Sequence, residues 1–580
     1  MNKSLKENIY RSVYCGLVDK SYIGKEIRLA GWVEQKRNLG SLIFITLRDE
    51  TGIVQLISED IDKFKDLTRE STITITGIVR ARLDGMANAN MKTGDIEVLI
   101  KDFTLLGAAA NVLPFEVSRS TEALEDTRLK YRYLDLRNPK VHNNILLRTK
   151  VIDYIRTLMK SMDFTEISTP IISTSSPEGA RDFVIPARNF KGKFYALPQA
   201  PQIYKQLLMV SGFNKYFQIA PCFRDEDCRA DRTLEFYQLD LEMSFVTEED
   251  VFEVGEKIFY DVFKEFGNKE VSSRPFRRIS WTEAMAKYGS DKPDLRNPLI
   301  IEDITDLFKD TNFNGFKDKT VKAIKIDSCD KPNSWFKKLE EFVADKGGKG
   351  LAYIKFEEDT LKGTIVKFLN ENEINAIKSK FNLKNGNVLF IIAGDKPEKL
   401  CGALRTKLGT ELDLISNDKY EFCIIYDFPM YSWNEEENKW DFEHNPFNMP
   451  KGGLSSLDKD PSEIYANQYD FVCNGNEMAS GAVRNHDIEI MKKAFSVAGY
   501  DEDVIKTKFR SLYTAFQYGA PPHAGMAPGI DRIIMLLTGE ENLREVQVFP
   551  PNVSGADLLM GGPNELDEKQ LRELHIKIRD

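Results

Sequence analysis

Hydrophobic positions in the first 112 residues alternate with polar ones at a period of two. Five short runs carry this alternation, separated by turns rich in Gly and Asp; they contain Ile27, Leu29 and Val33; Ile43, Ile45 and Leu47; Val54 and Leu56; Ile73, Ile75 and Val79; and Ile96, Val98 and Ile100. Each run has the periodicity of a strand with one buried face. A short amphipathic helix is predicted after the third run, around Phe64. Five strands interrupted there by one helix predict a small closed barrel of the oligonucleotide-binding type.

Positions between the predicted core residues should face outward from this barrel. On this register Phe44 and Gln55 point away from the core faces. An outward aromatic ring can stack on a base, and an amide beside it can hydrogen-bond one. The alternative is that Phe44 packs beneath a loop or against the next domain, and alternation by itself leaves both interpretations open.

The next segments change in character. Residues 107–141 are rich in small and charged side chains, which is typical of a connector that docks on its neighbours. From residue 142 apolar positions recur at helical spacing, at Ile145, Ile152, Ile155, Met159 and Met162. FTEISTPII (164–172) then has strand character with Pro170 inside it. Because proline lacks a ladder donor, this strand should lie at a sheet edge or a bulge, where a second subunit could cover it.

Charge is concentrated in RDEDCRADRTLEF (224–236), which holds three arginines and five carboxylates in thirteen positions. Most charge runs are solvated, salt-bridged helix faces. Here, however, apolar strand-like segments precede it (215–223) and follow it (235–245). That placement predicts the loop of a hairpin, where charged side chains tend to meet a ligand.

Two later segments also carry candidate chemistry. In NQYDFVCNGNEMASGAVRNHD (467–487), Asp470 and Glu477 could ligate a divalent cation. In APPHAGMAPGIDRIIMLLTG (520–539), small residues lead into a helix with Arg532 in its first turn, where free backbone N–H groups favour an anion. Residues 289–415 mix helical and strand signals with many lysines, which indicates a separate inserted domain.

Composition narrows the class of protein. Hydrophobic content of 42% and charged content of 29% over 580 residues predict a globular protein of about three to five domains. The net charge of −10 argues against a general nucleic-acid binder, although residues 1–112 hold 16 Lys/Arg against 15 Asp/Glu. Seven unpatterned cysteines predict reduced thiols, and neither a signal peptide nor a membrane-length apolar run is visible. A cytoplasmic location, with no membrane partner, follows as the expectation.

Together and in this order, the charged segments resemble the three signature motifs of class II aminoacyl-tRNA synthetases, most closely the bacterial-type aspartyl enzymes. FTEISTPII is similar to motif 1, CFRDEDCRADRTLEF to motif 2 and GMAPGIDRIIMLL to motif 3. SPEGARDFVIP (176–186) and LPQAPQIYKQLLM (197–209) are similar to that family's amino-acid-binding segments, and GWVEQKRNLGSLIFITLRD (31–49) to its anticodon-binding domain. The insertion matches the family's extra domain, although its name-giving Gly-Ala-Asp reads IIAGDK here (391–396).

The resemblance implies an α+β multidomain fold. Its parts are an N-terminal five-stranded OB-fold β-barrel, a class II synthetase antiparallel sheet flanked by helices, and an inserted α/β domain of the GAD type. The implied boundaries are 1–112 for the OB-fold anticodon-binding domain, 113–141 for a hinge or connector, 142–288 for the first part of the catalytic domain, 289–420 for the inserted domain, 421–560 for the second catalytic part and 561–580 for a C-terminal extension.

The implied reaction is attachment of L-aspartate to tRNA(Asp) in two steps, aspartyl-adenylate formation from ATP and transfer to the tRNA 3′ end. Arg224 would bridge the substrate carboxylate and the α-phosphate, and Arg532 would clamp the γ-phosphate; these two are the implied catalytic residues. No catalytic His or Cys is expected, because a carboxylate needs no base to become a nucleophile. A homodimer through the motif 1 region is also implied.

The resemblance also assigns binding residues. Those implied for ATP are Arg224, Asp225, Glu226, Thr233, Phe236, Glu477, Gly529, Ile530, Asp531 and Arg532. Those implied for aspartate are Glu178, Gln202, Lys205, Arg224, Asp240, His444 and Arg484. Mg²⁺ would be held by Asp470 and Glu477. The tRNA anticodon would meet Arg37, Phe44, Gln55 and Glu97.

Four positions depart from the bacterial pattern: Asn445 follows His444 where a second histidine is common, Ala200 replaces a serine, Thr233 a glutamine and Ile57 a phenylalanine. The first two concern the amino-acid pocket, Thr233 one ATP contact and Ile57 the anticodon face.

Alternative functions are an enzyme that also charges tRNA(Asn) and a non-charging RNA-binding paralogue. The Asn38-Leu39-Gly40 turn resembles enzymes confined to tRNA(Asp). A lysyl enzyme is disfavoured because its pocket should be acidic where Lys205 and Arg484 stand. An asparaginyl enzyme is disfavoured because it should lack the large insertion.

Overall fold

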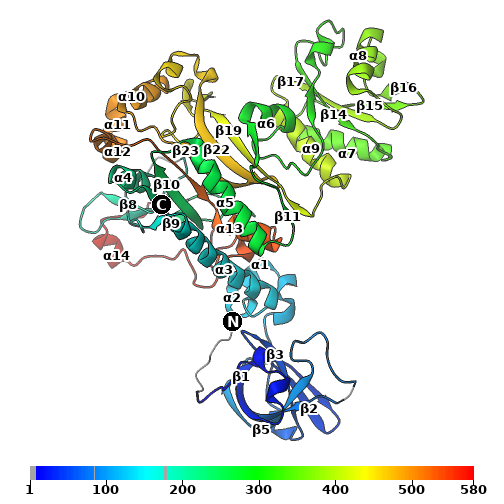
Figure 1. The fold of residues 1–580 in the computed structure, drawn as a ribbon, viewed down its shortest axis with the longest axis vertical. Coiled ribbons are helices and arrows are strands. Elements are labelled where there is room, and N and C mark those ends of the chain that lie inside the picture. The colour runs from blue at the N-terminus through cyan, green and yellow to red at the C-terminus, as the bar shows by residue number, and fades with distance from the viewer. Residues whose placement is uncertain (1–7, 84, 176–178, 580) are drawn as a thin grey trace. The chain divides into compact units, whose positions relative to one another are not determined.

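A computed structural model describes residues 8–83, 85–175 and 179–579, so Glu178 lies outside the described residues (Figure 1). The chain divides into two compact units, Met1–Arg119 and Ser120–Asp580. The finer division into connector, catalytic parts and inserted domain stays a prediction. In the described part of the chain, no helix is both long and apolar enough to span a membrane.

The first unit is a closed barrel with strand order β1-β2-β3-β5-β4, which confirms the five predicted strands. The alternating apolar positions fill its interior, and Leu29, Val33, Ile45 and Leu47 are fully buried. The predicted amphipathic helix is only a single 3-10 turn, η3 (Asp62–Phe64), because so few residues cannot sustain an α-helix. Its Phe64 side chain is nevertheless buried in the barrel core.

The elements of this unit have short connections. In chain order they are η1 (Cys15–Leu17), η2 (Lys20–Tyr22), β1 (Glu26–Leu39), β2 (Leu42–Asp49), β3 (Gly52–Ser58), η3, β4 (Thr72–Ala81), β5 (Ile96–Gly107) and the start of η4 (Val117–Glu122).

An eight-stranded sheet organises the second unit, with strand order β12-β19-β22-β23-β24-β10-β9-β6. All neighbouring strands are antiparallel except the outermost pairs, β12 with β19 and β6 with β9. Its strands are β6 (Thr165–Glu166), β9 (Lys215–Phe223), β10 (Glu235–Ser244), β12 (Arg277–Ser280), β19 (Phe422–Pro429), β22 (Tyr465–Cys473), β23 (Asn476–Val483) and β24 (His523–Pro528). The predicted hairpin around residues 224–234 is therefore confirmed as β9 and β10 with the charged loop between them.

Three helices share one hydrophobic core with this sheet: α3 (Pro139–Ser161), α5 (Glu248–Phe266) and α13 (Ile530–Thr538). The helix predicted from residue 142 begins three residues earlier, because Asn138 caps it and Pro139 fits its first turn. A capping box built on Thr247 and Asp250 starts α5. The sheet and these helices confirm the antiparallel, helix-flanked architecture.

The segment FTEISTPII lies at the sheet edge as predicted, but only Thr165–Glu166 forms a strand. Beyond this short strand the chain leaves the ladder before Pro170, which could not donate to it. Ile171 and Ile172 are left exposed.

The inserted segment has its own five-stranded sheet, in the order β13-β14-β17-β15-β16, with hydrophobic clusters on both faces. Its elements are β13 (Ile301–Asp303), η5 (Thr305–Phe308), β14 (Thr320–Ile326), α7 (Asn333–Asp345), β15 (Ala352–Glu357), β16 (Thr360–Gly363), η6 (Val366–Phe368), α8 (Glu371–Phe381), β17 (Val388–Gly394) and α9 (Glu398–Glu411).

Shorter elements complete the second unit. They are α1 (Glu125–Lys130), α2 (Arg132–Asp135), β7 (Val184–Pro186), β8 (Phe194–Ala196), α4 (Gln202–Val210), β11 (Glu270–Val271), α6 (Trp281–Tyr288), β18 (Lys419–Tyr420), β20 (Tyr431–Asn434), β21 (Lys439–Phe442), η7 (Gly453–Asp458), η8 (Pro461–Glu463), α10 (Ile488–Val497), α11 (Glu502–Lys508), α12 (Arg510–Phe516), η9 (Leu543–Glu545) and α14 (Glu568–Glu573).

Candidate functional site

A cavity of about 550 Å³ opens in the second unit. Side chains from α4, the β9–β10 hairpin, the β22–β23 hairpin and the start of α13 line it, together with the segment around His444. Thirteen of the residues implied for substrates or metal are among its lining: Gln202, Lys205, Arg224, Glu226, Thr233, Phe236, His444, Asp470, Glu477, Arg484, Gly529, Asp531 and Arg532. Segments more than 300 residues apart in sequence thus meet in one cavity.

One end of the cavity holds two buried cations, each paired with a carboxylate of β10. Lys205 Nζ donates to Asp240 Oδ1 at 2.7 Å. Arg484 donates to both oxygens of Glu242, at 2.9 and 3.1 Å. Burial tends to raise the pKa of Glu242, but the charges of Arg484 and Lys205 outweigh it and lower the pKa. Glu242 is therefore held as a carboxylate that orients the Arg484 guanidinium.

Glu242 was not among the residues implied by the sequence. Asp240 and Glu242 are two positions apart on β10, so they face the same side of the sheet. Acidic residues at this period inside an otherwise apolar strand are the signal that could have found it. Burial raises the pKa of Asp240, and Lys205 offsets only part of that rise.

The Asp470 and Glu477 side chains lie on the hairpin of β22 and β23. Asp470 Oδ1 is buried and has no hydrogen-bond partner within the described ranges. Burial, and after it the carboxylate of Glu477, raise the pKa of Asp470 well above its ordinary value. Such a carboxylate is stabilised by a nearby cation. Lys292 supplies one, since its Nζ lies 3.2 Å from Glu477 Oε2.

A divalent ion fits this donor set, because Asp470 has a buried carboxylate oxygen without a partner among the described residues and Glu477 lines the same cavity. The described residues contain no cluster of three or more His, Cys, Asp or Glu side chains that could hold a metal alone. Further oxygen ligands would have to come from phosphate or water, as is usual for Mg²⁺. Lys292 itself was missed by the sequence reasoning, and no local signal marks it.

The charged hairpin loop contributes an arginine stacked on an aromatic ring. The guanidinium of Arg224 lies 5.0 Å from the centroid of Phe236. Its Nε has no hydrogen-bond partner in the part of the chain described. Glu226 pairs with Arg232 at 3.3 Å. The Arg532 guanidinium donates to the backbone oxygen of Glu477 at 2.8 Å. Two arginines with spare donors therefore face the cavity.

Other implied ATP residues are engaged within the protein. Asp531 accepts from the backbone N–H of Tyr237 at 3.0 Å and is hydrogen-bonded to Arg148 of α3. The hydroxyl of Thr233 donates to the backbone oxygen of Glu235 at 2.7 Å. Ile530 is buried in the hydrophobic core, so only its backbone could meet a nucleotide. Asp225 is not among the cavity lining in the described chain; all four roles remain predictions.

His444 and the departures from the family pattern also lie at the cavity. Burial lowers the pKa of His444, which favours the neutral imidazole. Ala200 and Asn445 line the cavity beside it, so both bear on the shape of this end. Gln202 is buried and also lines the cavity. Glu178, the remaining implied aspartate ligand, lies outside the described residues.

The four residues implied for the anticodon lie together on one outer face of the barrel. Arg37 pairs with Phe44 across β1 and β2, and Phe44 with Ile57 across β2 and β3. Directly beside them, Gln55 donates to Glu97 at 2.9 Å. Phe44 is partly exposed, whereas its neighbours Ile43 and Ile45 are buried. The predicted outward register is confirmed; contact with RNA stays a prediction.

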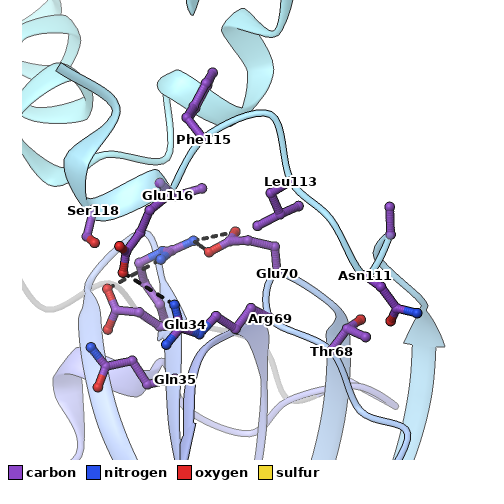
Figure 2. Close-up of a pocket in the computed structure, with 13 residues that line it drawn as sticks. Glu34, Gln35, Thr68, Arg69, Glu70, Asn111, Leu113, Phe115, Glu116 and Ser118 are labelled. Carbon is purple, nitrogen blue, oxygen red and sulfur yellow. Dashed lines mark hydrogen bonds and ion pairs between the residues drawn. The ribbon is translucent and has the colours of Figure 1, made fainter. Parts of the chain in front are cut away.

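A second cavity, of about 380 Å³, lies in the first unit between the barrel and residues 110–118 (Figure 2). Buried Arg48 donates to both oxygens of Glu70, at 2.9 and 2.7 Å, and pairs with Glu34 at 3.3 Å. Arg69 pairs with Glu116 at 3.3 Å. The Arg69–Glu116 pair, whose side chains are both about half exposed, joins residues 110–118 to the barrel unit, whereas Arg48, Glu70 and Glu34 are paired with one another.

A family model for class II tRNA synthetases of the D, K and N group matches residues 124–553, and an OB-fold nucleic-acid-binding model matches residues 27–106. The chain belongs to the class II tRNA synthetase family. The match spans the whole cavity described above, so the resemblance of the three motifs is confirmed.

Relatives with high identity cover almost the full chain. A protein of Rickettsia canadensis named aspartate–tRNA(Asp/Asn) ligase is 49% identical over 589 residues, covering 98% of each chain. One of the same name from Ehrlichia canis is 51% identical over 587 residues, covering 98% of this chain and 99% of the relative.

Solved structures share the fold. The asparaginyl-tRNA synthetase of Pyrococcus horikoshii, complexed with asparaginyl-adenylate, aligns with a TM-score of 0.59 at 20% identity, covering 94% of this chain and 98% of that one. The aspartyl-tRNA synthetase of Entamoeba histolytica aligns with a TM-score of 0.55 at 21% identity, covering 92% and 89%. At these identities the likeness concerns the fold alone.

Proposed function

We propose that this class II synthetase attaches L-aspartate to tRNA(Asp), using ATP to form aspartyl-adenylate first. The observation that carries the proposal is the pair of buried cations, Lys205 and Arg484, in the same cavity as Arg224 and Arg532. A substrate with a side-chain carboxylate fits two charged donors. The relatives' printed names, which include aspartate, support the same choice.

Selectivity for aspartate follows from the cost of burying charge. The aspartate carboxylate would lie against Lys205 and Arg484, whose present partners are Asp240 and Glu242. An asparagine side chain brings no charge and forms no ion pair with either cation, a difference of several kcal/mol. A lysine substrate would meet two like charges. His444 adds a donor at this end, and Asp240, Gln202 and Glu178 are assigned to the substrate ammonium.

In the activation step an oxygen of the aspartate α-carboxylate forms a bond to the α-phosphorus of ATP, and the bond to the pyrophosphate oxygen breaks. The protein must hold two anions together and neutralise the charge that develops. Arg224 would bridge the carboxylate and the α-phosphate, because a guanidinium fork can donate to both. Arg532 would hold the γ-phosphate, Phe236 would stack on adenine, and Glu226 would accept from its amino group.

Asp470 and Glu477 would hold Mg²⁺, which supplies positive charge to the phosphates when bound. In the second step a hydroxyl oxygen of the tRNA 3′ end forms an ester bond to the carbonyl carbon of the adenylate, the bond from that carbon to the phosphate oxygen breaks, and AMP leaves with the hydroxyl proton. The barrel face of Arg37, Phe44, Gln55 and Glu97 would bind the anticodon. We further propose a homodimer through residues 164–172 and a cytoplasmic location, supported by seven free cysteines.

An enzyme that charges both tRNA(Asp) and tRNA(Asn) is the second candidate. The relatives named aspartate–tRNA(Asp/Asn) ligase favour it. The Asn38-Leu39-Gly40 turn at the end of β1 favours an enzyme that charges tRNA(Asp) alone. Both candidates share the activation step and differ only in the tRNA accepted.

The experiment is aspartate-dependent ATP–pyrophosphate exchange, followed by charging of purified tRNA(Asp) and tRNA(Asn) side by side. We expect exchange with aspartate and at least about 100-fold less with asparagine or lysine. Exchange that is absent with aspartate, or equal with asparagine, would refute the proposal. Charging of tRNA(Asn) at a rate similar to that of tRNA(Asp) would select the second candidate.

A further inference from the structure

A group of buried charges outside the cavity joins helices α1 and α2 to residues 542–548. Arg128 donates to both oxygens of Glu545, at 2.6 and 2.7 Å, and also pairs with Asp135 at 3.1 Å. Arg132 is hydrogen-bonded to the same Asp135. None of these groups takes part in the proposed chemistry, and burying them is costly unless each charge is paired and hydrogen-bonded.

Arg132 fixes the backbone of this segment. Its guanidinium donates to the carbonyl oxygens of Arg544, Gln547 and Val548, at 3.1, 2.7 and 3.0 Å. Because one planar guanidinium binds three backbone carbonyls, the backbone conformation of residues 544–548 is restricted. Residues 542–548 are therefore part of the same rigid network as the connector helices.

The other side of the segment holds the charged hairpin loop. Arg544 donates to the backbone oxygen of Arg229 at 3.1 Å, and the N–H of Leu543 donates to that of Ala230 at 2.9 Å. Gln547 donates to the hydroxyl of Thr233 and the backbone oxygen of Glu235, both at 3.2 Å. The loop that carries the implied ATP residues is thus fastened from outside, by residues that do not belong to any of its motifs.

Arg544 is the junction of the two sides. While one nitrogen reaches the loop, Nε and a second terminal nitrogen donate to the carboxylate of Glu125 on α1, at 3.1 and 3.2 Å. Its side chain is buried, whereas the Glu125 side chain is about one third exposed. A guanidinium can bind a carboxylate through two N–H donors and a carbonyl through a third in one fixed plane, a geometry that a lysine ammonium cannot reproduce.

We propose that Arg544, held by Glu125, is a positioning residue for ATP, through which the connector helices set the conformation of loop 224–234. The inference rests on the proposed function of that loop as the ATP-binding segment. Arg544 lies outside the family's three motifs and touches no reacting atom. It acts by keeping the loop backbone, and with it Glu226 and Arg232, in the conformation that receives the nucleotide.

The test compares Arg544→Lys with Glu125→Gln and with a matched control, Lys140→Gln. Lys140 also joins the start of the second unit to this region, through an exposed pair with Glu540 at 3.0 Å, but that pair does not touch the loop. We expect Arg544→Lys to raise the KM for ATP in pyrophosphate exchange by about tenfold, as expected for the loss of a charged hydrogen bond. The KM for aspartate should change less than about twofold, and the control should leave both unchanged.

A second readout does not depend on activity. Hydrogen exchange of the backbone amides of residues 226–236 should become at least about tenfold faster in Arg544→Lys and Glu125→Gln, but not in the control. An unchanged KM for ATP with unchanged loop exchange would overturn the proposal, and so would an equal rise in the KM of both substrates. If Arg544→Lys does not fold, Glu125→Gln carries the same test, because its side chain is partly exposed.

The two failures are distinguishable. If the parent protein shows no aspartate-dependent exchange, the proposed function fails, while loop exchange still decides whether Arg544 positions the loop. If the parent is active and the variants behave like the control, only the positioning role is refuted.

Discussion

Arg224 differs from the other cations of the cavity in how it is held. Lys205 and Arg484 are each paired with a buried carboxylate, whereas Arg224 is stacked on Phe236. Stacking orients a guanidinium without occupying its N–H donors. Arg224 is therefore the side chain best prepared to receive an incoming anion.

Replacing Arg224 by Ala should remove most of the activation step. We expect kcat/KM for pyrophosphate exchange to fall by about 100- to 1000-fold, as on loss of one donor to a developing oxyanion. Arg224→Lys should restore little of it, since an ammonium lacks the fork. Arg572→Ala, which removes an exposed pair with Glu568 within α14, is the control and should remain fully active. Near-normal exchange in Arg224→Ala would contradict the assigned role.

His523 gives the fold a dependence on pH. It is fully buried on β24, beside Gln206 at 3.2 Å, and burial lowers its pKa below the ordinary 6.5. Below that pH the unfolded chain binds a proton that the folded chain resists. Stability is therefore present above about pH 6.5 and is lost as the pH falls toward the lowered pKa.

We expect His523→Gln to reduce this loss. Urea midpoints measured between about pH 7 and pH 5 should fall less steeply in the variant than in the parent. His575→Gln replaces an exposed histidine and serves as the control. Parallel pH profiles for the parent and His523→Gln would show that another group causes the acid sensitivity.

At the scale of elements, periodicity predicted the strands of the barrel well. Side chains at every second position alternate between core and solvent, so Ile43 and Ile45 point inward and Phe44 outward. The same logic was less successful at residues 164–172 and 61–67. At residues 164–172 the strand is short because only Thr165 and Glu166 pair with β9. At residues 61–67 the segment has too few residues to extend an α-helix.

Phe44→Ala should separate tRNA binding from activation. Because base stacking contributes about 1–3 kcal/mol, we expect the KM for tRNA(Asp) to rise about 5- to 150-fold in the charging assay. Aspartate-dependent pyrophosphate exchange should be unaffected. Tyr10→Ala is the control, because it removes another exposed aromatic ring and should change neither step. The backbone oxygen of Tyr10, which the substitution keeps, accepts a hydrogen bond from the hydroxyl of Thr74 on β4. Equal loss of both steps in Phe44→Ala would argue against an anticodon role.

At the scale of the whole molecule, the second unit ends its large sheet in a two-residue strand, β6. Because β6 is so short, most of the edge of its neighbour β9 has no strand beside it, and unpaired backbone groups at a sheet edge can pair with another chain. Ile171 and Ile172, which follow β6, are exposed by 46% and 61%. An apolar edge of this kind is what a second subunit would cover, as we propose for the homodimer.

Ile172→Lys should weaken that dimer, because a charge would have to be buried at the interface. Sedimentation velocity across a dilution series should show a dissociation constant at least about tenfold higher than in the parent. Ile578→Lys, an equally exposed isoleucine near the C-terminus, is the control. A parent that sediments as a monomer at all concentrations would refute the proposed dimer.

The sequence by itself determined the barrel strands, the charged hairpin and the helix predicted from residue 142, because each depends on local periodicity. It also determined the family, because the motifs are contiguous and keep their order. Glu242, Lys292 and Arg544 were decided only by tertiary structure. Their partners lie up to 419 positions away along the chain, and a side chain's charge does not reveal which distant carboxylate or carbonyl will satisfy it once both are buried.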